Sequence, residues 1–153
     1  MRGLSNYDVG MPPGDNASRR ANVVWCMNNA FAPGNRTMLA NGSHSSWRGF
    51  RPFDRRVIYN YFNTIIPPNG PSCTENDGGE QNWGIYPPQS RHSGGVSAGF
   101  LDGSVRFITD SVDTNGLNAA NGGGGGSATY TGPSVFGVWG ALGSIAGGES
   151  RSL

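Results

Sequence analysis

The Asp-Gly pair at residues 102 and 103 constrains the fold of this chain more than any other feature. It lies between two runs in which apolar and polar residues alternate, "GVSAGFL" and "SVRFIT". Such alternation is typical of strands with one face in a core, and Asp-Gly favours a type I′ turn, in which both central residues have positive φ. The pattern predicts an antiparallel hairpin of residues 96–101 and 104–109 with a two-residue loop.

A two-residue loop fixes which residues face each other across the hairpin. It pairs Phe100 with Val105, and Gly99 with Arg106, so that the glycine leaves room for the long arginine side chain. The face expected to be core carries Val96, Ala98, Phe100, Val105 and Phe107. The opposite face, with Leu101, Ser104, Arg106, Ser97 and Ile108, is expected to be half exposed.

The composition predicts a small core surrounded by many turns. The 153 residues include 26 glycines and 10 prolines, and only 35% are hydrophobic and 14% charged. We therefore expect a single mainly β domain (β-rich α+β) over residues 1–153, with an antiparallel sheet and long irregular loops. Residues 1–20 are expected to form a loop-like start, and residues 114–134 a flexible glycine-rich insertion.

Three further segments have readable local patterns. Residues 21–31, "ANVVWCMNNAF", favour a strand, with a short helix as the alternative. Residues 56–66 are rich in β-branched and aromatic side chains and predict a strand that Pro67 ends. Residues 139–142 predict a short helical turn that stops at Gly143.

Charge and motif spacing exclude several classes of function. A net charge of +1 gives no field that would gather nucleic acid or an anionic membrane, and no apolar run is long enough to insert into a bilayer. The absence of lysine excludes a phosphate-binding Walker lysine and a Schiff base. The serine of "GVSAG", Ser97, lies in a hairpin strand instead of before a helix, which argues against a hydrolase elbow. We expect no catalytic residue and no enzyme activity.

His92 is expected at the root of the hairpin, at the opposite end from Asp102. Extending the register backwards brings the segment around His92 close to Asp110 and Asp113. These three residues can pin the entering chain by hydrogen bonds, bind a cation or act in catalysis. The first interpretation is favoured, because one histidine and two aspartates make a poor zinc site.

Two other residue sets leave alternatives open. Cys26 and Cys73 match no metal spacing, and are either a disulfide that closes a loop of roughly 48 residues or two buried thiols. The acidic segment "TENDGGEQNWG" could hold calcium through Glu75, Asp77 and Glu80. A solvated acidic loop is the favoured reading of that segment, because the ligand pattern of an EF-hand is missing.

The stretch "HSGGVSAGFLDGSVRF" resembles the signature of a bacterial prepilin-type processing-associated domain, which is a histidine, nine residues and then Asp-Gly. That domain closes members of the domain of unknown function 1559 (DUF1559) family. The motif residues are His92, Gly94, Gly95, Asp102, Gly103 and Arg106. The segments "FNTIIPPNGPSC", "GIYPPQSRHSGGV" and "VWGALGSIAGGE" are also similar to that family, in the same order.

The resemblance implies a pilin-like, β-rich head without the long N-terminal helix. It implies a non-catalytic, extracytoplasmic protein of the cell envelope or a secreted one, which acts with other pseudopilin-like or envelope proteins in assembly or secretion. The chain has no prepilin leader, so we expect it to be the C-terminal head alone. The alternative is a module that binds glycan or another surface ligand through the aromatic residues Trp47, Trp83 and Tyr86.

Overall fold

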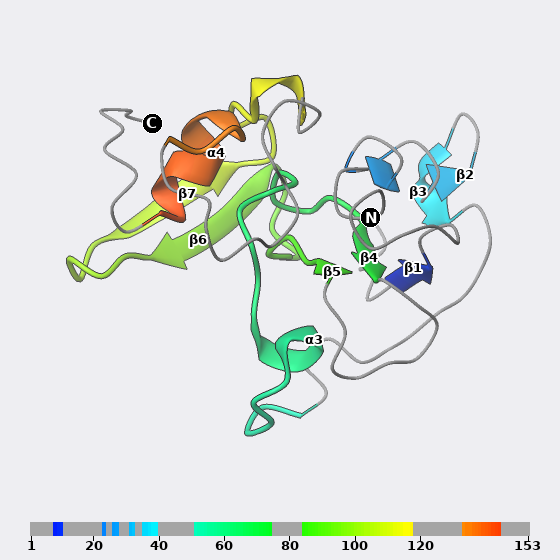
Figure 1. The fold of residues 1–153 in the computed structure, drawn as a ribbon, viewed down its shortest axis with the longest axis horizontal. Coiled ribbons are helices and arrows are strands. Elements are labelled where there is room, and N and C mark those ends of the chain that lie inside the picture. Colours follow the sequence, from blue (N-terminus) through cyan, green and yellow to red (C-terminus); the bar gives the residue numbers. More distant parts are fainter. Residues whose placement is uncertain are drawn as a thin grey trace.

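The fold is built from short strands and a few single turns of helix (Figure 1). The structure, a computed structural model, describes residues 8–10, 23, 26–27, 31–32, 35–39, 51–74, 84–117 and 133–144. Its strands are β1 (Asp8–Gly10), β2 (Phe31–Ala32), β3 (Asn35–Leu39), β4 (Ser72–Thr74), β5 (Gly84–Ile85), β6 (Gly95–Gly99) and β7 (Val105–Thr109). Its helices are α3 (Val57–Asn60), the 3-10 turn η1 (Asn115–Leu117) and α4 (Gly137–Leu142). The expected β-rich α+β class is confirmed.

The strands form three small sheets. β4 lies between β1 and β5, β2 pairs with β3, and β6 pairs with β7. β4 and β1 are parallel, with Asp8 opposite Ser72, so the expectation of purely antiparallel pairing is corrected here. β1 also lies within the stretch expected to be loop. A three-residue strand whose partner is far away in the sequence leaves no local signal.

The β6–β7 hairpin exists, but its loop has three residues instead of two. The N–H of Gly103 donates to the oxygen of Phe100 at 3.0 Å, and the N–H of Phe100 donates to the oxygen of Ser104 at 2.9 Å. Only Gly103 of the Asp-Gly pair has positive φ, at 81°. This is a type I turn followed by a glycine bulge, not the expected type I′ turn.

The extra loop residue shifts β7 by one position and turns it over. Val96 now pairs with Ile108 and Ala98 with Arg106. Ile108 is buried at 0% exposure, whereas Val105 is 73% and Phe107 is 52% exposed. The expected core face is therefore correct along β6 and wrong along β7, because the side-chain period of a strand is two.

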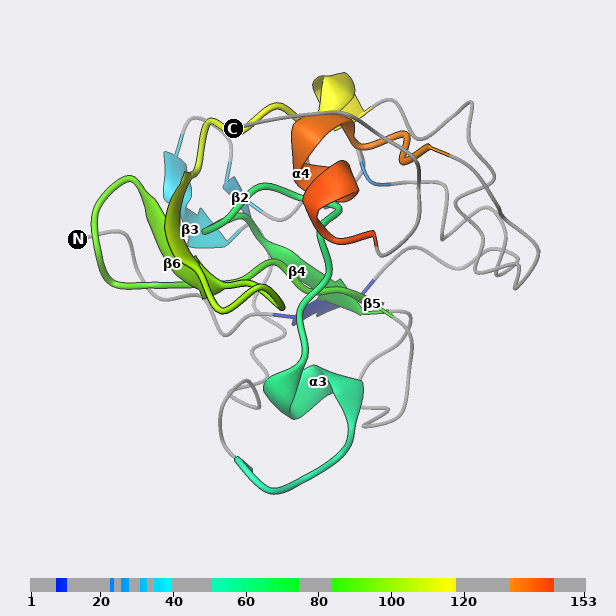
Figure 2. The ribbon, with the colours of Figure 1, turned by 90° about the vertical axis from the view of Figure 1, so that its left-hand side faces the viewer.

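The core consists of separate apolar clusters. One is formed by Val23, Cys26, Ile66, Cys73 and Ile85. A second joins the hairpin to α4 through Val96, Ile108 and Trp139. A small third cluster pairs Tyr59 with Tyr86. α4 packs on the hairpin through Trp139, whereas Figure 2 shows α3 below the sheets, on the side of the molecule away from α4.

Two strand expectations are corrected to helix. Val23, Cys26 and Met27 have helical conformation, which is the alternative that the sequence left open for residues 21–31. The strand expected from residue 56 is replaced by α3 and an irregular segment. The turn before α3 is closed by Asp54, which accepts hydrogen bonds from the backbone N–H and the guanidinium of Arg56. These local bonds outweigh the β propensity of the segment.

The C-terminal turn is predicted correctly. α4 covers Gly137–Leu142 and ends at Gly143, as expected from the sequence. The glycine-rich insertion was expected over residues 114–134. Its residues 115–117 form η1, and its residues 118–132 lie outside the described residues. In the ranges given above, none of the helices has the length and apolar character needed to cross a membrane.

Candidate functional site

A groove of about 400 Å³ lies between the end of β6, the segment that follows α3, and α4. Its walls are formed by Phe62, Asn63, Thr64, Ala98, Gly99, Phe100, Leu101, Trp139, Leu142 and Gly143. None of these ten residues is charged, and six of them have apolar or aromatic side chains. The size and the lining are those of a binding site for an uncharged group.

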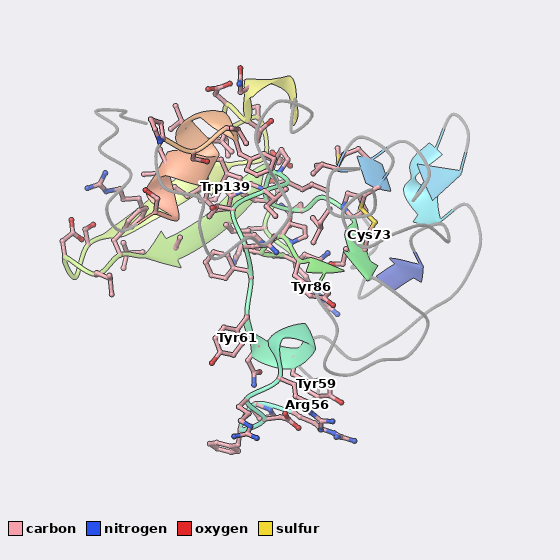
Figure 3. The ribbon with its side chains drawn as sticks, viewed as in Figure 1. Arg56, Tyr59, Tyr61, Cys73, Tyr86 and Trp139 are labelled. Atoms are coloured by element: carbon pink, nitrogen blue, oxygen red, sulfur yellow. A yellow bond between two sulfur atoms is a disulfide. The ribbon has the colours of Figure 1, made fainter. Side chains whose placement is uncertain are left out.

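Trp139 is the fixed part of the groove. Its side chain is 2% exposed, and its indole N–H donates a buried hydrogen bond of 2.9 Å to the backbone oxygen of Ile66. The ring of Phe62 lies nearly parallel to it, at 7° with 6.5 Å between ring centroids. Phe62 itself is 52% exposed. Figure 3 shows Trp139 beneath α4, facing the segment that rises from α3.

Asn63 holds the second wall in place. Its backbone N–H donates to the oxygen of Tyr86 at 2.9 Å. Its side-chain amide donates to the oxygen of Gly84 at 2.9 Å, and its side-chain oxygen accepts the N–H of Tyr86 at 3.2 Å. Asn63 therefore fastens residues 62–64 to the end of β5. No local pattern predicts this role of Asn63, because its partners lie 21 and 23 residues away.

The edge of β6 that faces away from β7 presents unpaired backbone groups. The backbone N–H of Phe100 donates to the oxygen of Ser104, and the N–H of Asp110 donates to the oxygen of Gly94. The even-numbered residues of β6 therefore direct their N–H and C=O groups toward β7. Ser97 and Gly99 point theirs the other way, and within the described part of the chain these groups form no hydrogen bond. At the start of this edge, Asn69 donates to the oxygen of Gly95 at 3.5 Å.

The outer face of the hairpin carries exposed apolar side chains. Val105 and Phe107 are 73% and 52% exposed, and Leu101, in the loop at the tip of the hairpin, is 98% exposed. The residues opposite the first two are Gly99 and Ser97. Because these partners are so small, they cover little of Val105 and Phe107, and the ring of Phe107 extends over Gly95. We call these three residues, Leu101, Val105 and Phe107, the outer apolar face.

The motif residues at the tip organise the loop. Asp102 accepts the N–H of Ser104 at 2.8 Å, and this hydrogen bonding from Ser104 lowers the pKa of Asp102. Arg106 lies 3.6 Å from the Asp102 carboxylate and stacks over the ring of Phe100 at 5.0 Å. Gly103 supplies the positive φ that the bulge requires. This end of the motif is structural.

The root of the hairpin is not assembled around His92. His92 is exposed, and among the described residues no hydrogen bond or ion pair joins it to Asp110 or Asp113. Instead, the N–H of Asp110 donates to the oxygen of Gly94, which has a φ of 85°. Asp113 turns toward α4, where it accepts the N–H of Val138 at 3.3 Å. The register brings the segment after His92 beside Asp110, but among the described residues no hydrogen bond or ion pair joins the three side chains.

The remaining candidates have mixed outcomes. Cys26 and Cys73 form a disulfide, the first of the two alternatives, and both are fully buried (Figure 3). Tyr86 is 0% exposed and packs against Tyr59, so it offers no surface to a ligand, and that part of the aromatic set is corrected. Trp47 and Trp83 lie outside the described residues, as do Glu75, Asp77 and Glu80. Within the described residues, no group of acidic, histidine or cysteine side chains has the arrangement of a metal site.

Comparison with known proteins gives one result. No curated protein and no solved structure matches the chain. The model of one protein family matches residues 14–115, more than half of the chain, and its description is "protein of unknown function (DUF1559)". The matched range contains the disulfide, the segment 62–64 and the whole hairpin. The chain therefore belongs to the DUF1559 family.

Proposed function

We propose that this protein is a non-catalytic, extracytoplasmic head domain that acts in the cell envelope through contact with other proteins, as a pseudopilin-like protein would. The observation that carries the proposal is the outer apolar face. Three apolar side chains of this one two-stranded hairpin are between 52% and 98% exposed. Contiguous exposed apolar residues on a soluble domain mark an interaction surface.

The disulfide supports the location. Disulfides persist in oxidising compartments such as the periplasm and the cell surface, and are rare in the reducing cytosol. Cys26 and Cys73 are both fully buried in the main apolar cluster, so the bond belongs to the core of the fold. A core that contains a disulfide favours a protein that matures outside the cytoplasm.

The unpaired edges of the hairpin support the mode of action. Within the described part of the chain, the N–H groups of Val105 and Phe107 on β7, like those of Ser97 and Gly99 on β6, point away from the partner strand and form no hydrogen bond. Exposed strand edges are templates for pairing with another chain. An apolar face bordered by two such edges suits assembly contacts.

The proposal is tested by site-specific photo-crosslinking in the native cells. A photoreactive phenylalanine analogue replaces Phe107 on the outer apolar face, and replaces Phe53 as the control. Phe53 is 101% exposed and lies four residues before α3, a helix that lies apart from the hairpin (Figure 1). We expect position 107 to form adducts with a second envelope protein, identified by mass spectrometry, and position 53 to form few. Adducts with cytosolic proteins only, or equal yields at both positions, would contradict the proposal.

A further inference from the structure

We propose that the groove receives an extended, uncharged peptide segment of another protein, which adds to the free edge of β6 as a third strand of the hairpin sheet. The inference rests on the proposed function as a contact domain and specifies a second, separate surface of it. The groove and the outer apolar face are different: of the three residues of that face, only Leu101 also lines the groove.

The backbone of β6 supplies the pairing groups. Ser97 and Gly99 are two residues apart in one strand, and both direct an N–H and a C=O away from β7. Two residues of extended chain span about 6.6 Å, so the free groups repeat at the spacing of a second strand. Main-chain hydrogen bonds of this kind provide the affinity when a peptide is added to a sheet edge.

Gly99 belongs both to the free edge of β6 and to the lining of the groove. It lines the groove, and because it has no side chain, the surface it contributes is its own backbone. A Cβ atom built at Gly99 would stand on the outer face, opposite Val105, and would meet no atom within 4 Å, so a strand added at this edge meets no obstruction on that face beside Gly99. A glycine inside a strand often marks a position where another backbone approaches closely. The N–H of the next residue, Phe100, already donates to the oxygen of Ser104 in the hairpin. Only the odd-numbered residues of β6 therefore have backbone groups that can pair with an added strand.

The aromatic and aliphatic walls seat the side chains of the added strand. Phe62 is half exposed beside the buried Trp139, and Phe100 and Leu142 complete the apolar surface. With no charged residue in the lining, the groove is complementary in charge only to an uncharged segment. An apolar side chain at every second position of the peptide would face this wall.

The lining favours a peptide over a sugar. Sugar hydroxyl groups need several polar side chains as hydrogen-bond partners, and only Asn63 and Thr64 have polar side chains among the ten lining residues. The amide of Asn63 is already bonded to Gly84 and Tyr86 through its nitrogen and oxygen, respectively. Apart from the Thr64 hydroxyl, the polar groups that the groove offers are those of the backbone, which a peptide backbone satisfies in register.

The probes are blocked peptides in which threonine alternates with valine, leucine, isoleucine or phenylalanine. Each is titrated into the full, disulfide-bonded chain up to about 1 mM, where weak complexes are occupied. We expect at least one peptide to shift the amide resonances of Ser97 and Gly99 and to slow the hydrogen exchange of the Gly99 amide. The same peptide with alternate amide nitrogens methylated should lose binding, because it keeps every side chain but lacks the donors.

Two matched pairs of variants locate the site. Gly99→Pro removes a backbone N–H from the outer edge of β6 and leaves every hydrogen bond between β6 and β7 in place. Val105, the residue opposite Gly99, gives the control: Val105→Pro removes a backbone N–H from the outer edge of β7. We expect the first to weaken binding about fivefold or more and the second to leave it unchanged. Phe62→Ala should weaken binding as well, whereas Phe107→Ala, at the same 52% exposure, should not.

Three results would overturn the inference: no shift with any of the peptides, equal binding of the methylated peptide, or equal effects of the paired variants. Shifts confined to Phe62 and Trp139 with oligosaccharides instead of peptides would assign the groove to sugar and would also overturn it. The crosslinks from position 107 are independent of the groove, so their survival in the Gly99→Pro variant would show that the proposed function stands when this inference fails.

Discussion

The indole N–H of Trp139 donates a 2.9 Å hydrogen bond to the backbone oxygen of Ile66, 73 residues earlier in the chain. Trp139 belongs to the cluster between α4 and the hairpin, and Ile66 belongs to the cluster that contains the disulfide. This bond therefore connects the two larger parts of the core. It also sets the position of Trp139 in the groove, because the ring has no freedom to rotate while the bond is kept.

Replacing Trp139 with phenylalanine tests this connection. The substitution keeps an aromatic ring but leaves the buried oxygen of Ile66 without its donor, and we expect the free energy of unfolding to fall by about 1–3 kcal/mol. Urea denaturation of the oxidised protein measures the change. A loss below about 0.5 kcal/mol, within the range of ordinary surface substitutions, would show that the bond is not important for stability.

Removing the disulfide should destabilise the protein substantially. The bond joins residues separated by 47 positions, and closing a loop of that length stabilises the folded state by about 4 kcal/mol in the chain-entropy description. The double variant Cys26→Ala, Cys73→Ala should lose about that amount in urea denaturation. Wild-type protein reduced before unfolding is the control and should match the variant. If the reduced and oxidised proteins have the same urea midpoint, the disulfide does not stabilise the folded state.

Two glycine-to-alanine substitutions should have contrasting effects. Gly137 has a φ of 58°, and a Cβ there would come within 2.5 Å of the Asp113 carboxylate. Gly137→Ala should therefore cost about 2 kcal/mol or more and loosen the start of α4. Gly99→Ala enters open space and should change stability by less than about 0.5 kcal/mol. Thermal unfolding of both variants measures the difference, and equal melting temperatures would contradict the geometry at Gly137.

The turn before α3 should weaken in acid. The side-chain hydrogen bonds from Arg56 lower the pKa of Asp54 from 3.8 to about 2. Because the folded-state value lies below the unfolded one, the stabilising contribution is present above about pH 4 and is lost as the pH falls toward 2. The carboxyl carbon shift of Asp54 should titrate near 2. In Arg56→Gln this pKa should rise toward 3.8, and an unchanged midpoint in that variant would exclude the Arg56 side chain as the main cause.

The hairpin shows what local sequence can and cannot predict. Asp102-Gly103 and the flanking alternation were enough to place both strands and the reversal between them. They did not determine the loop length, because an Asp-Gly pair fits both a two-residue turn and the last two positions of a three-residue loop with a bulge. The choice of Ile108 over Phe107 as the buried residue depends on the packing of Trp139, which comes from a distant part of the chain.

The groove could not be predicted because its parts are distant in sequence. α4 and its end at Gly143 were predicted from local pattern, and Phe100 was placed on the correct face of β6. The wall at residues 62–64 was expected to be a strand, and it exists because Asn63 bonds to the end of β5. Tyr86 was expected at the surface, since an aromatic residue between turn signals gives no indication of depth. It is buried beside Tyr59.

The stretch from Ile66 to Cys73 lies inside both long-range closures, the disulfide to Cys26 and the hydrogen bond from Trp139. When the disulfide-linked part of the domain is held and the part with the hairpin and α4 is pulled, these eight residues carry the load. Their three prolines already restrict the backbone, and the covalent bond at one end cannot yield to force. The hydrogen bond at the other end is the weaker of the two closures, so under such a load we expect it to break while the disulfide stays intact.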